Sequence, residues 1–224
     1  MIYESGTQGY FGTHSGSRSR CAGSCQPAWG IDNERWPDLS VLQDAHAAEL
    51  FVKARIAQEH PLLIFEELPR STQAAGPFLD LEDLFKKGRT LQWSDLPERL
   101  WATTDIVLPN RAVFEQFGKY RNIVQHLASP TERDPSEETL KFIFGVIEPF
   151  IHSCWNLFAV DYDEDMELYV YFVPELVRRK ILFMVSPEAA ACFDEWNVDW
   201  KDVAPAYKDE MHRRVNAASS PGRA

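Results

Sequence analysis

The stretch NRAVFEQFGKYRNIVQHL, residues 110–127, has the hydrophobic spacing of an amphipathic α-helix. At about 100° per residue, its apolar side chains recur at spacings of three and four and fall on one face. We expect this face to pack into a core and the opposite face to carry polar groups. The predicted core face consists of Val113, Phe117, Tyr120, Val124 and Leu127, flanked by Phe114 and Ile123.

Four hydrogen-bonding side chains lie off this face, near the end of the same helix. Asn122 and His126 are one turn apart and point away from the core, whereas Arg121 and Gln125 lie on the flank between the two faces. Arg121 and His126 point roughly 140° apart on an ideal helix. They can meet at one phosphate only through the reach of the guanidinium or beside a second helix, which indicates a dimeric site.

The order Arg121-Asn122-Ile123-Val124-Gln125-His126 resembles the signature of the HEPN superfamily: an arginine, a polar residue, three variable positions and a histidine. Residues 44–56, DAHAAELFVKARI, are similar to the first helix of HEPN proteins. Together the two segments cover roughly the middle half of the chain. The adenylylated subclass of the family ends its motif with Ala-x-Tyr, whereas Leu127 and Ala128 follow His126 here, so the resemblance does not extend to that subclass.

The resemblance implies a metal-independent endoribonuclease in which the ribose 2′-hydroxyl attacks the adjacent phosphorus. His126 would transfer a proton, Arg121 would bind the phosphoryl oxygens, and Asn122 would orient either His126 or the phosphate. Active HEPN ribonucleases generally bring two motifs together across a dimer. We therefore expect a homodimer that acts on RNA, in toxin–antitoxin or antiviral defence, with an antitoxin protein as a possible partner.

A second polar group lies on a helix that we expect from Ser40 to about Glu59. Its apolar stripe is flanked by His46, Glu49 and Lys53, at spacings of three and four. Together with Gln125, these residues are candidates for auxiliary groups near Arg121. The alternative, which we favour, is an ordinary Glu49–Lys53 ion pair with His46 half buried. The apolar stripe itself consists of Val41, Ala45, Ala48, Val52 and Ile56.

The rest of the sequence divides the chain into four parts. Residues 1–37 are rich in Gly, Ser and Thr without a regular period, and predict an irregular arm. Residues 38–160 carry the helices of the predicted bundle, residues 161–216 add a C-terminal helical extension, and residues 217–224 predict a disordered tail. We therefore expect an all-α fold: an antiparallel helical bundle of HEPN type with an additional C-terminal helical layer.

Local signals set several helix boundaries within this scheme. A short helix is expected at residues 80–87, Asn110 is expected to cap the motif helix, and the sequence Asp134-Pro135-Ser136-Glu137 predicts the start of a long core helix that Pro149 bends. Residues 62–65 either continue the first helix after a kink or form a short packed segment. The sequence leaves both of these possibilities open.

Composition limits the classes of function. The chain is 45% hydrophobic and 25% charged, as in soluble globular proteins, and its net charge of −11 argues against broad electrostatic binding to nucleic acid. Any RNA site must therefore be local. Because no apolar run approaches the roughly 20 residues that cross a bilayer, we expect a soluble, cytoplasmic protein without a membrane partner. Cys21 and Cys25 lack a second ligand pair, and we expect no metal and no cofactor.

Two other functions are compatible with the same residues. A catalytically inactive HEPN-like helical module would bind a partner protein or a nucleotide without cleaving RNA, and the acidic charge balance favours this competitor. Alternatively, Arg121 and His126 are surface residues of an unrelated helical protein. A structure in which Arg121 and His126 both lie far from any cleft would favour the interpretation that they are ordinary surface residues.

Overall fold

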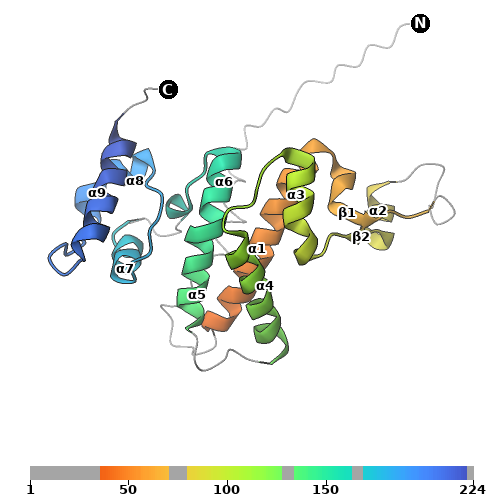
Figure 1. Cartoon of the computed structure of the whole chain (residues 1–224), viewed down its shortest axis with the longest axis horizontal. Coiled ribbons are helices and arrows are strands. Elements are labelled where there is room, and N and C mark those ends of the chain that lie inside the picture. The colour runs from red at the N-terminus through yellow and green to blue at the C-terminus, as the bar shows by residue number, and fades with distance from the viewer. Residues whose placement is uncertain (1–35, 71–79, 128–133, 163–168, 221–224) are drawn as a thin grey trace, which may run out of the picture.

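The structure is a computed structural model that describes residues 36–70, 80–127, 134–162 and 169–220. Helices form most of these residues, and a two-stranded antiparallel sheet is the only sheet within them. The all-α expectation is therefore confirmed at the level of fold class. Helix α1 (Trp36–Glu59) lies at the centre of the main helical unit, where several later helices contact it (Figure 1). None of the described helices combines the length and the apolar character needed to cross a bilayer.

Helix α1 buries the stripe predicted for it. The five residues of that stripe are each at most 3% exposed, because their spacing of three and four places them on one face. The helix begins at Trp36, ahead of the predicted start at Ser40. Ser40 therefore lies inside the helix, where its hydroxyl donates to the carbonyl of Pro37 at 2.7 Å.

A small sheet follows α1 and was not predicted. The elements are, in order, η3 (Pro61–Ile64), β1 (Phe65–Glu67), α2 (Leu81–Lys87) and β2 (Arg89–Thr90). The two strands pair antiparallel, with Phe65 opposite Thr90. Residues 62–65 thus form a 3₁₀ turn and the start of a strand, and they do not continue the helix. The pairing joins segments that are distant in sequence, so no local pattern identifies it.

Two residues with left-handed backbone frame the connection between the next two helices. Helix α3 (Leu96–Thr104) ends at Asp105, which has φ 59°, and α4 (Arg111–His126) follows Asn110, which has φ 45°. Asn110 is at the predicted N-cap position, but its side chain makes no capping hydrogen bond. Its Nδ2 instead donates to the carbonyl of Gly145 at 2.5 Å, which links the start of α4 to the long helix beside it.

The long helix contains a π-helical segment. It consists of α5 (Pro135–Phe142), the π-helix η6 (Ile143–Ile147) and α6 (Glu148–Trp155). Its predicted start is confirmed, because the Asp134 side chain accepts the backbone N–H of Ser136 at 2.9 Å. Pro149 has no N–H to donate to the Gly145 carbonyl four residues earlier. The side chain of Asn110 supplies that hydrogen bond, and the helix continues past the proline.

The long helix formed by α5, η6 and α6 contributes residues to two hydrophobic clusters, one on each side of it. Phe142, Val146 and Phe150 belong to the cluster around α1, whereas Leu140 and Phe144 belong to a second cluster. The C-terminal helices complete this second cluster and lie beside α5 and α6 in Figure 1. The C-terminal elements are η7 (Ala159–Asp161), α7 (Phe172–Arg178), α8 (Pro187–Ala191), η8 (Phe193–Glu195) and α9 (Pro205–Ser219).

Helix α9 extends into the tail that we expected to be disordered from residue 217. It continues to Ser219, whose hydroxyl donates to the carbonyl of Val215 at 2.9 Å. The sequence here contains Ala217 and Ala218, and alanine has the highest helix propensity. Ala218 also packs against the second cluster, so the helix gains a tertiary contact at this end. The arm at residues 1–35, with both of its cysteines, and residues 221–224 lie outside the described residues.

A buried carboxyl group lies between α6 and the C-terminal helices. Glu148 is 1% exposed, and it accepts the backbone N–H of Met184 at 2.7 Å, while its Oε1 has no hydrogen-bond partner. Burial raises the pKa of Glu148 from 4.5 to about 8, against the lowering effects of its backbone hydrogen bonds and of Arg214. The carboxyl group is therefore largely protonated at neutral pH in the folded protein.

We expect Glu148→Gln to remove a pH-dependent loss of stability. The ordinary pKa of a glutamate side chain is 4.5, and the pKa of Glu148 in the folded protein is about 8. The stability that it contributes is therefore complete below the lower value and is lost as pH rises through the higher one. Glutamine stays neutral and keeps an oxygen for the Met184 N–H.

Urea unfolding of both proteins at about pH 5 and about pH 9 measures this difference. We expect the wild type to lose about 2–5 kcal/mol relative to the variant over that interval. Equal changes in the free energy of unfolding for the two proteins would contradict the assignment of a neutral, buried Glu148.

Candidate functional site

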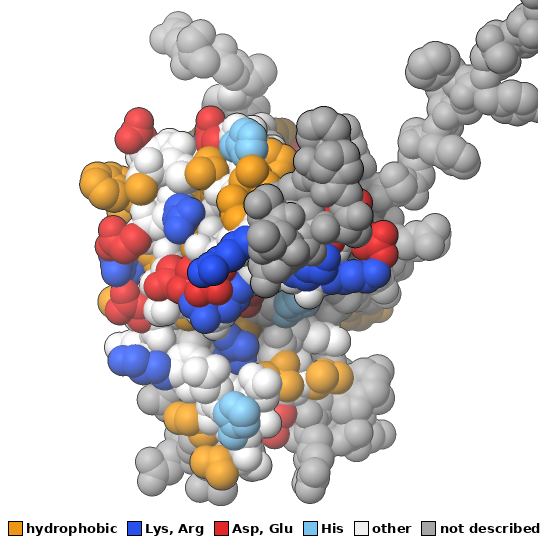
Figure 2. Space-filling model, turned by 90° about the vertical axis from the view of Figure 1, so that its right-hand side faces the viewer, with side chains coloured by type: hydrophobic (Ala, Val, Ile, Leu, Met, Phe, Trp, Pro, Cys, Tyr) orange, Lys and Arg blue, Asp and Glu red, His pale blue; other side chains and the backbone are white. Residues whose placement is uncertain are grey.

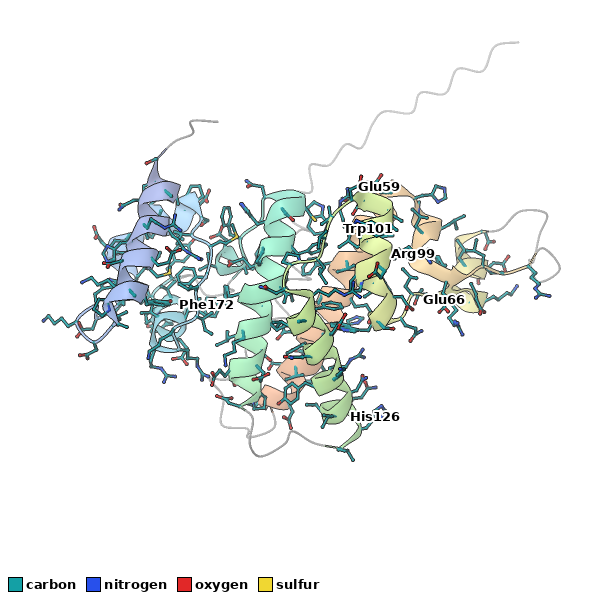
Figure 3. The ribbon with its side chains drawn as sticks, in the orientation of Figure 1. Glu59, Glu66, Arg99, Trp101, His126 and Phe172 are labelled. Carbon is teal, nitrogen blue, oxygen red and sulfur yellow. The ribbon has the colours of Figure 1, made fainter. Side chains whose placement is uncertain are left out.

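Helix α4 carries all four residues of the predicted motif near its C-terminal end. His126 is the last residue of the helix and is exposed, as are Asn122 and Gln125. Figure 3 shows His126 at the end of α4, away from the other helices. Arg121 is half-buried, and its guanidinium lies over the ring of Trp93. The helix thus places the imidazole in solvent and the guanidinium against the protein.

The buried face of α4 is rotated from the face predicted. Phe117 is buried as expected, but Val113 is 38% exposed and Leu127 is 84% exposed. Phe114, which we placed on the flank, is 1% exposed. The prediction was wrong on this point because it considered only large apolar side chains. It gave no weight to Gly118, which is also buried.

Gly118 leaves space on α4 for the side chain of Trp93. The Trp93 ring stacks on Phe114 with ring centroids 4.0 Å apart and planes 6° apart. Its Nε1 donates to the carbonyl of Phe114 at 3.3 Å. A Cβ atom at residue 118 would lie 2.2 Å from this nitrogen. Any side chain at this position would therefore displace the indole.

The same indole contacts Arg121 one turn further along α4. The guanidinium carbon of Arg121 lies 5.5 Å from the centroid of the Trp93 ring, within the range of a cation–π interaction. The Nε of Arg121 is buried and has no hydrogen-bond partner. A buried unpaired donor costs about 1–3 kcal/mol, whereas the cation–π contact contributes about 0.5–2 kcal/mol. The two ranges overlap, so the cation–π contact is of the size needed to offset the cost of the unpaired donor.

Arg121 differs from seven other described arginines, which pair with carboxylates, in having no acidic partner among the described residues. Within the described residues, no side chain or carbonyl accepts a hydrogen bond from its guanidinium, although the chain has 34 acidic residues. The unpaired N–H groups of such a guanidinium can donate to an anion that binds to the protein. The arginines that pair with carboxylates are Arg55, Arg89, Arg111, Arg178, Arg179, Arg213 and Arg214.

A row of exposed polar side chains on α4 includes one residue that the sequence analysis missed. Lys119, Asn122 and His126 are separated by three and four residues, so they share one side of the helix. The spacing was visible in the sequence, because Lys119 precedes His126 by about two helical turns. Gln125 is exposed but lies about 100° from His126. A cation, an amide and an imidazole in one row are suited to contact a phosphate.

The auxiliary candidates on α1 make contacts of their own. Lys53 forms an ion pair with Glu49 at 2.6 Å and donates to the hydroxyl of Thr90, on β2, at 3.1 Å. The ion pair that we favoured from the spacing is therefore present, and it ties α1 to the small sheet. His46, expected to be half buried, is exposed. Among the described residues, no hydrogen bond or ion pair joins this group to Arg121.

The surface charge and the possible ligands limit the chemistry further. On the face shown in Figure 2, Lys and Arg side chains lie mixed with Asp and Glu side chains, and the coloured surface shows no continuous basic area. The described part of the chain contains no group of three or more His, Cys, Asp and Glu side chains placed to hold a metal ion. Cys154 and Cys192 are free thiols.

Comparisons of the chain with protein-family models, with curated proteins and with solved structures find no match.

We expect Gly118→Ala to destabilise the protein by about 1–3 kcal/mol, because the added methyl group collides with the Trp93 indole. Gly145→Ala is the matched control, since a Cβ there meets only the Nδ2 of Asn110, at 3.9 Å. That substitution should be neutral or stabilising by up to about 1 kcal/mol. Denaturant unfolding measures both, and equal stability of the two variants would show that the indole does not occupy this position.

Proposed function

We propose that this chain is a metal-independent endoribonuclease of the HEPN type, with an antiparallel helical bundle that presents Arg121 and His126 to RNA. One observation carries the proposal. In a chain of net charge −11, Arg121 has no acidic partner among the described residues, and it lies on the same helix as the exposed His126. An unpaired guanidinium and an accessible imidazole are the groups that phosphodiester cleavage requires.

The proposed reaction uses the RNA itself as the nucleophile. The imidazole of His126 accepts the proton of the ribose 2′-hydroxyl while the hydroxyl oxygen bonds to the adjacent phosphorus. The bond from phosphorus to the 5′-oxygen breaks, and that oxygen takes a proton from solvent water. Arg121 binds the phosphoryl oxygens as negative charge develops on them, and Asn122 orients the phosphate or His126. The products are a 2′,3′-cyclic phosphate and a 5′-hydroxyl, and DNA is no substrate because it lacks the nucleophile.

A homodimer would complete the site. Within one chain the guanidinium of Arg121 lies against Trp93, whereas His126 is in solvent, roughly 140° around the helix. We therefore propose that Arg121 of one copy and His126 of the other act on the same phosphate. Ile123 and Leu127, which are 40% and 84% exposed, lie at the edge of the polar row of α4 and are the apolar residues that would pack between the two copies.

The biological role proposed with this activity is defence of the cell. An uncontrolled ribonuclease in the cytoplasm would damage its own host, so we propose a toxin–antitoxin or antiviral setting in which an antitoxin protein holds the enzyme inactive. The acidic balance of the chain supports a second candidate, a catalytically inactive HEPN-like module that binds a partner protein or a nucleotide.

We expect the purified protein to cleave RNA in the presence of EDTA. Arg121→Ala should lower the rate about 10²–10³-fold, because the developing charge loses its donors. His126→Ala should lower it about 10²–10⁴-fold, because proton transfer is lost. Gel analysis of end-labelled RNA, with chemical identification of the 2′,3′-cyclic phosphate, measures both effects.

Arg111→Ala is the matched control for these variants. Arg111 is on the same helix, but it is exposed and pairs with Glu98 and Glu115, so its loss should leave the rate unchanged. Stable, folded protein that cleaves no RNA under any condition would instead support the inactive binding module. Equal rates for Arg111→Ala and Arg121→Ala would contradict the role given to Arg121.

A mixing experiment tests the shared site. Arg121→Ala and His126→Ala proteins, each about 100-fold or more slower than the wild type when alone, should regain about a quarter of the wild-type activity when they are unfolded and refolded together. Half of the random dimers are then mixed, and each mixed dimer has one intact site of two. No recovery in a mixture shown by mass spectrometry to contain mixed dimers would contradict a site shared between copies.

A further inference from the structure

Trp93 contacts three successive turns of α4. It belongs to the 3₁₀ turn η5 (Trp93–Asp95), which precedes α3. Its ring stacks on Phe114, its Nε1 lies over the bare backbone at Gly118, and its π face meets the guanidinium of Arg121. One side chain from outside α4 thus spans the helix from its core face to the proposed catalytic arginine.

The indole is itself fixed from several directions. Its Nε1 donates to the carbonyl of Phe114 at 3.3 Å, and its ring centroid lies 6.3 Å from that of Phe142 on α5. Phe142 in turn stacks on Phe117 at 3.8 Å. Because aromatic side chains packed in this way have few available rotamers, the ring presents a fixed surface to Arg121.

The contact leaves Arg121 with an unusual combination of features. Its position is restricted by the ring and by burial of Nε, yet no carboxylate pairs with it among the described residues. Restricting an arginine with a carboxylate would occupy its donors, whereas an aromatic face leaves the edge of the guanidinium available.

We propose that Trp93 is a positioning residue that holds the guanidinium of Arg121 in place to bind an RNA phosphate. The inference rests on the proposed ribonuclease activity. Trp93 does not touch the reacting atoms. It acts through Arg121, and Gly118 is the position that allows the indole to approach. A fixed cation needs no reorganisation when charge develops on the phosphate, so its effect falls mainly on kcat and not on KM.

The test compares Trp93→Leu, Trp93→Phe and wild-type protein in cleavage of one RNA oligonucleotide. Leucine removes the aromatic face, and kcat should fall about 10- to 100-fold, with KM changed by less than about threefold. Phenylalanine keeps an aromatic face and should retain most of the wild-type kcat. Arg111→Ala, on the same helix, should match the wild type.

A second measurement follows Arg121 without any use of catalysis. In the wild type, the ¹⁵N–¹H signal of the buried Arg121 Nε should be shifted by the indole ring and protected from exchange with water. In Trp93→Leu protein it should lose both properties. Site-specific incorporation of tetrafluorotryptophan at position 93 keeps the ring shape but removes the negative π face. It should lower kcat with little change in melting temperature, and it serves as the decisive variant if Trp93→Leu does not fold.

The outcomes separate the two proposals. A wild-type protein that cleaves no RNA would contradict the proposed ribonuclease activity and, with it, the positioning role of Trp93. A wild-type protein that cleaves RNA, with unchanged kcat in both the leucine and the fluorinated variants, overturns the positioning role alone. An Arg121 Nε signal that is identical in wild-type and Trp93→Leu protein also overturns it, because the ring would then not restrict the guanidinium.

Discussion

The contact between the indole of Trp93 and the bare backbone at Gly118 determines how α4 sits in this protein. The indole can approach the helix backbone this closely only because Gly118 has no side chain, since a Cβ at position 118 would be 2.2 Å from the indole nitrogen. With the indole seated there, Phe114 faces the core and Leu127 faces solvent. The rotation of the helix then decides which polar groups are exposed. His126 is among them, while Arg121 lies on the ring.

Local sequence signals predicted the parts of the fold that depend on one helix at a time. The apolar stripe of α1 and the start of α5 at Asp134 follow from spacing and capping chemistry, and both are present. The small sheet, the π-helical segment and the seat for Trp93 depend on contacts between segments far apart in the chain. Pro149 has no N–H to donate to the Gly145 carbonyl. The side chain of Asn110, at the start of α4, donates to this carbonyl instead. The hydrophobic spacing within either helix does not predict that hydrogen bond.

The sequence likewise predicted some residues of the candidate site and missed others. The sequence was sufficient to place Arg121, Asn122 and His126 on one helix and to separate the directions of the arginine and the histidine. It missed Trp93, because Trp93 lies 28 positions before Arg121, and no spacing rule links a 3₁₀ turn to a later helix. It missed Lys119, although its spacing from His126 is helical, because Lys119 precedes the motif that begins at Arg121. Glu49 and Lys53, which we considered as auxiliary groups, pair with each other, and Lys53 also bonds to Thr90 of the small sheet.

The proposed ribonuclease activity requires that Arg121 and His126 act on the same phosphate. The most direct measurement is an NMR titration with an RNA oligonucleotide whose 2′-hydroxyls are methylated, so that it binds without being cleaved. The signals of the Arg121 side chain and of the His126 ring should shift together with one dissociation constant, while the paired side chain of Arg111 stays unchanged. Shifts of only one group, or two groups that respond with different affinities, would contradict the claim.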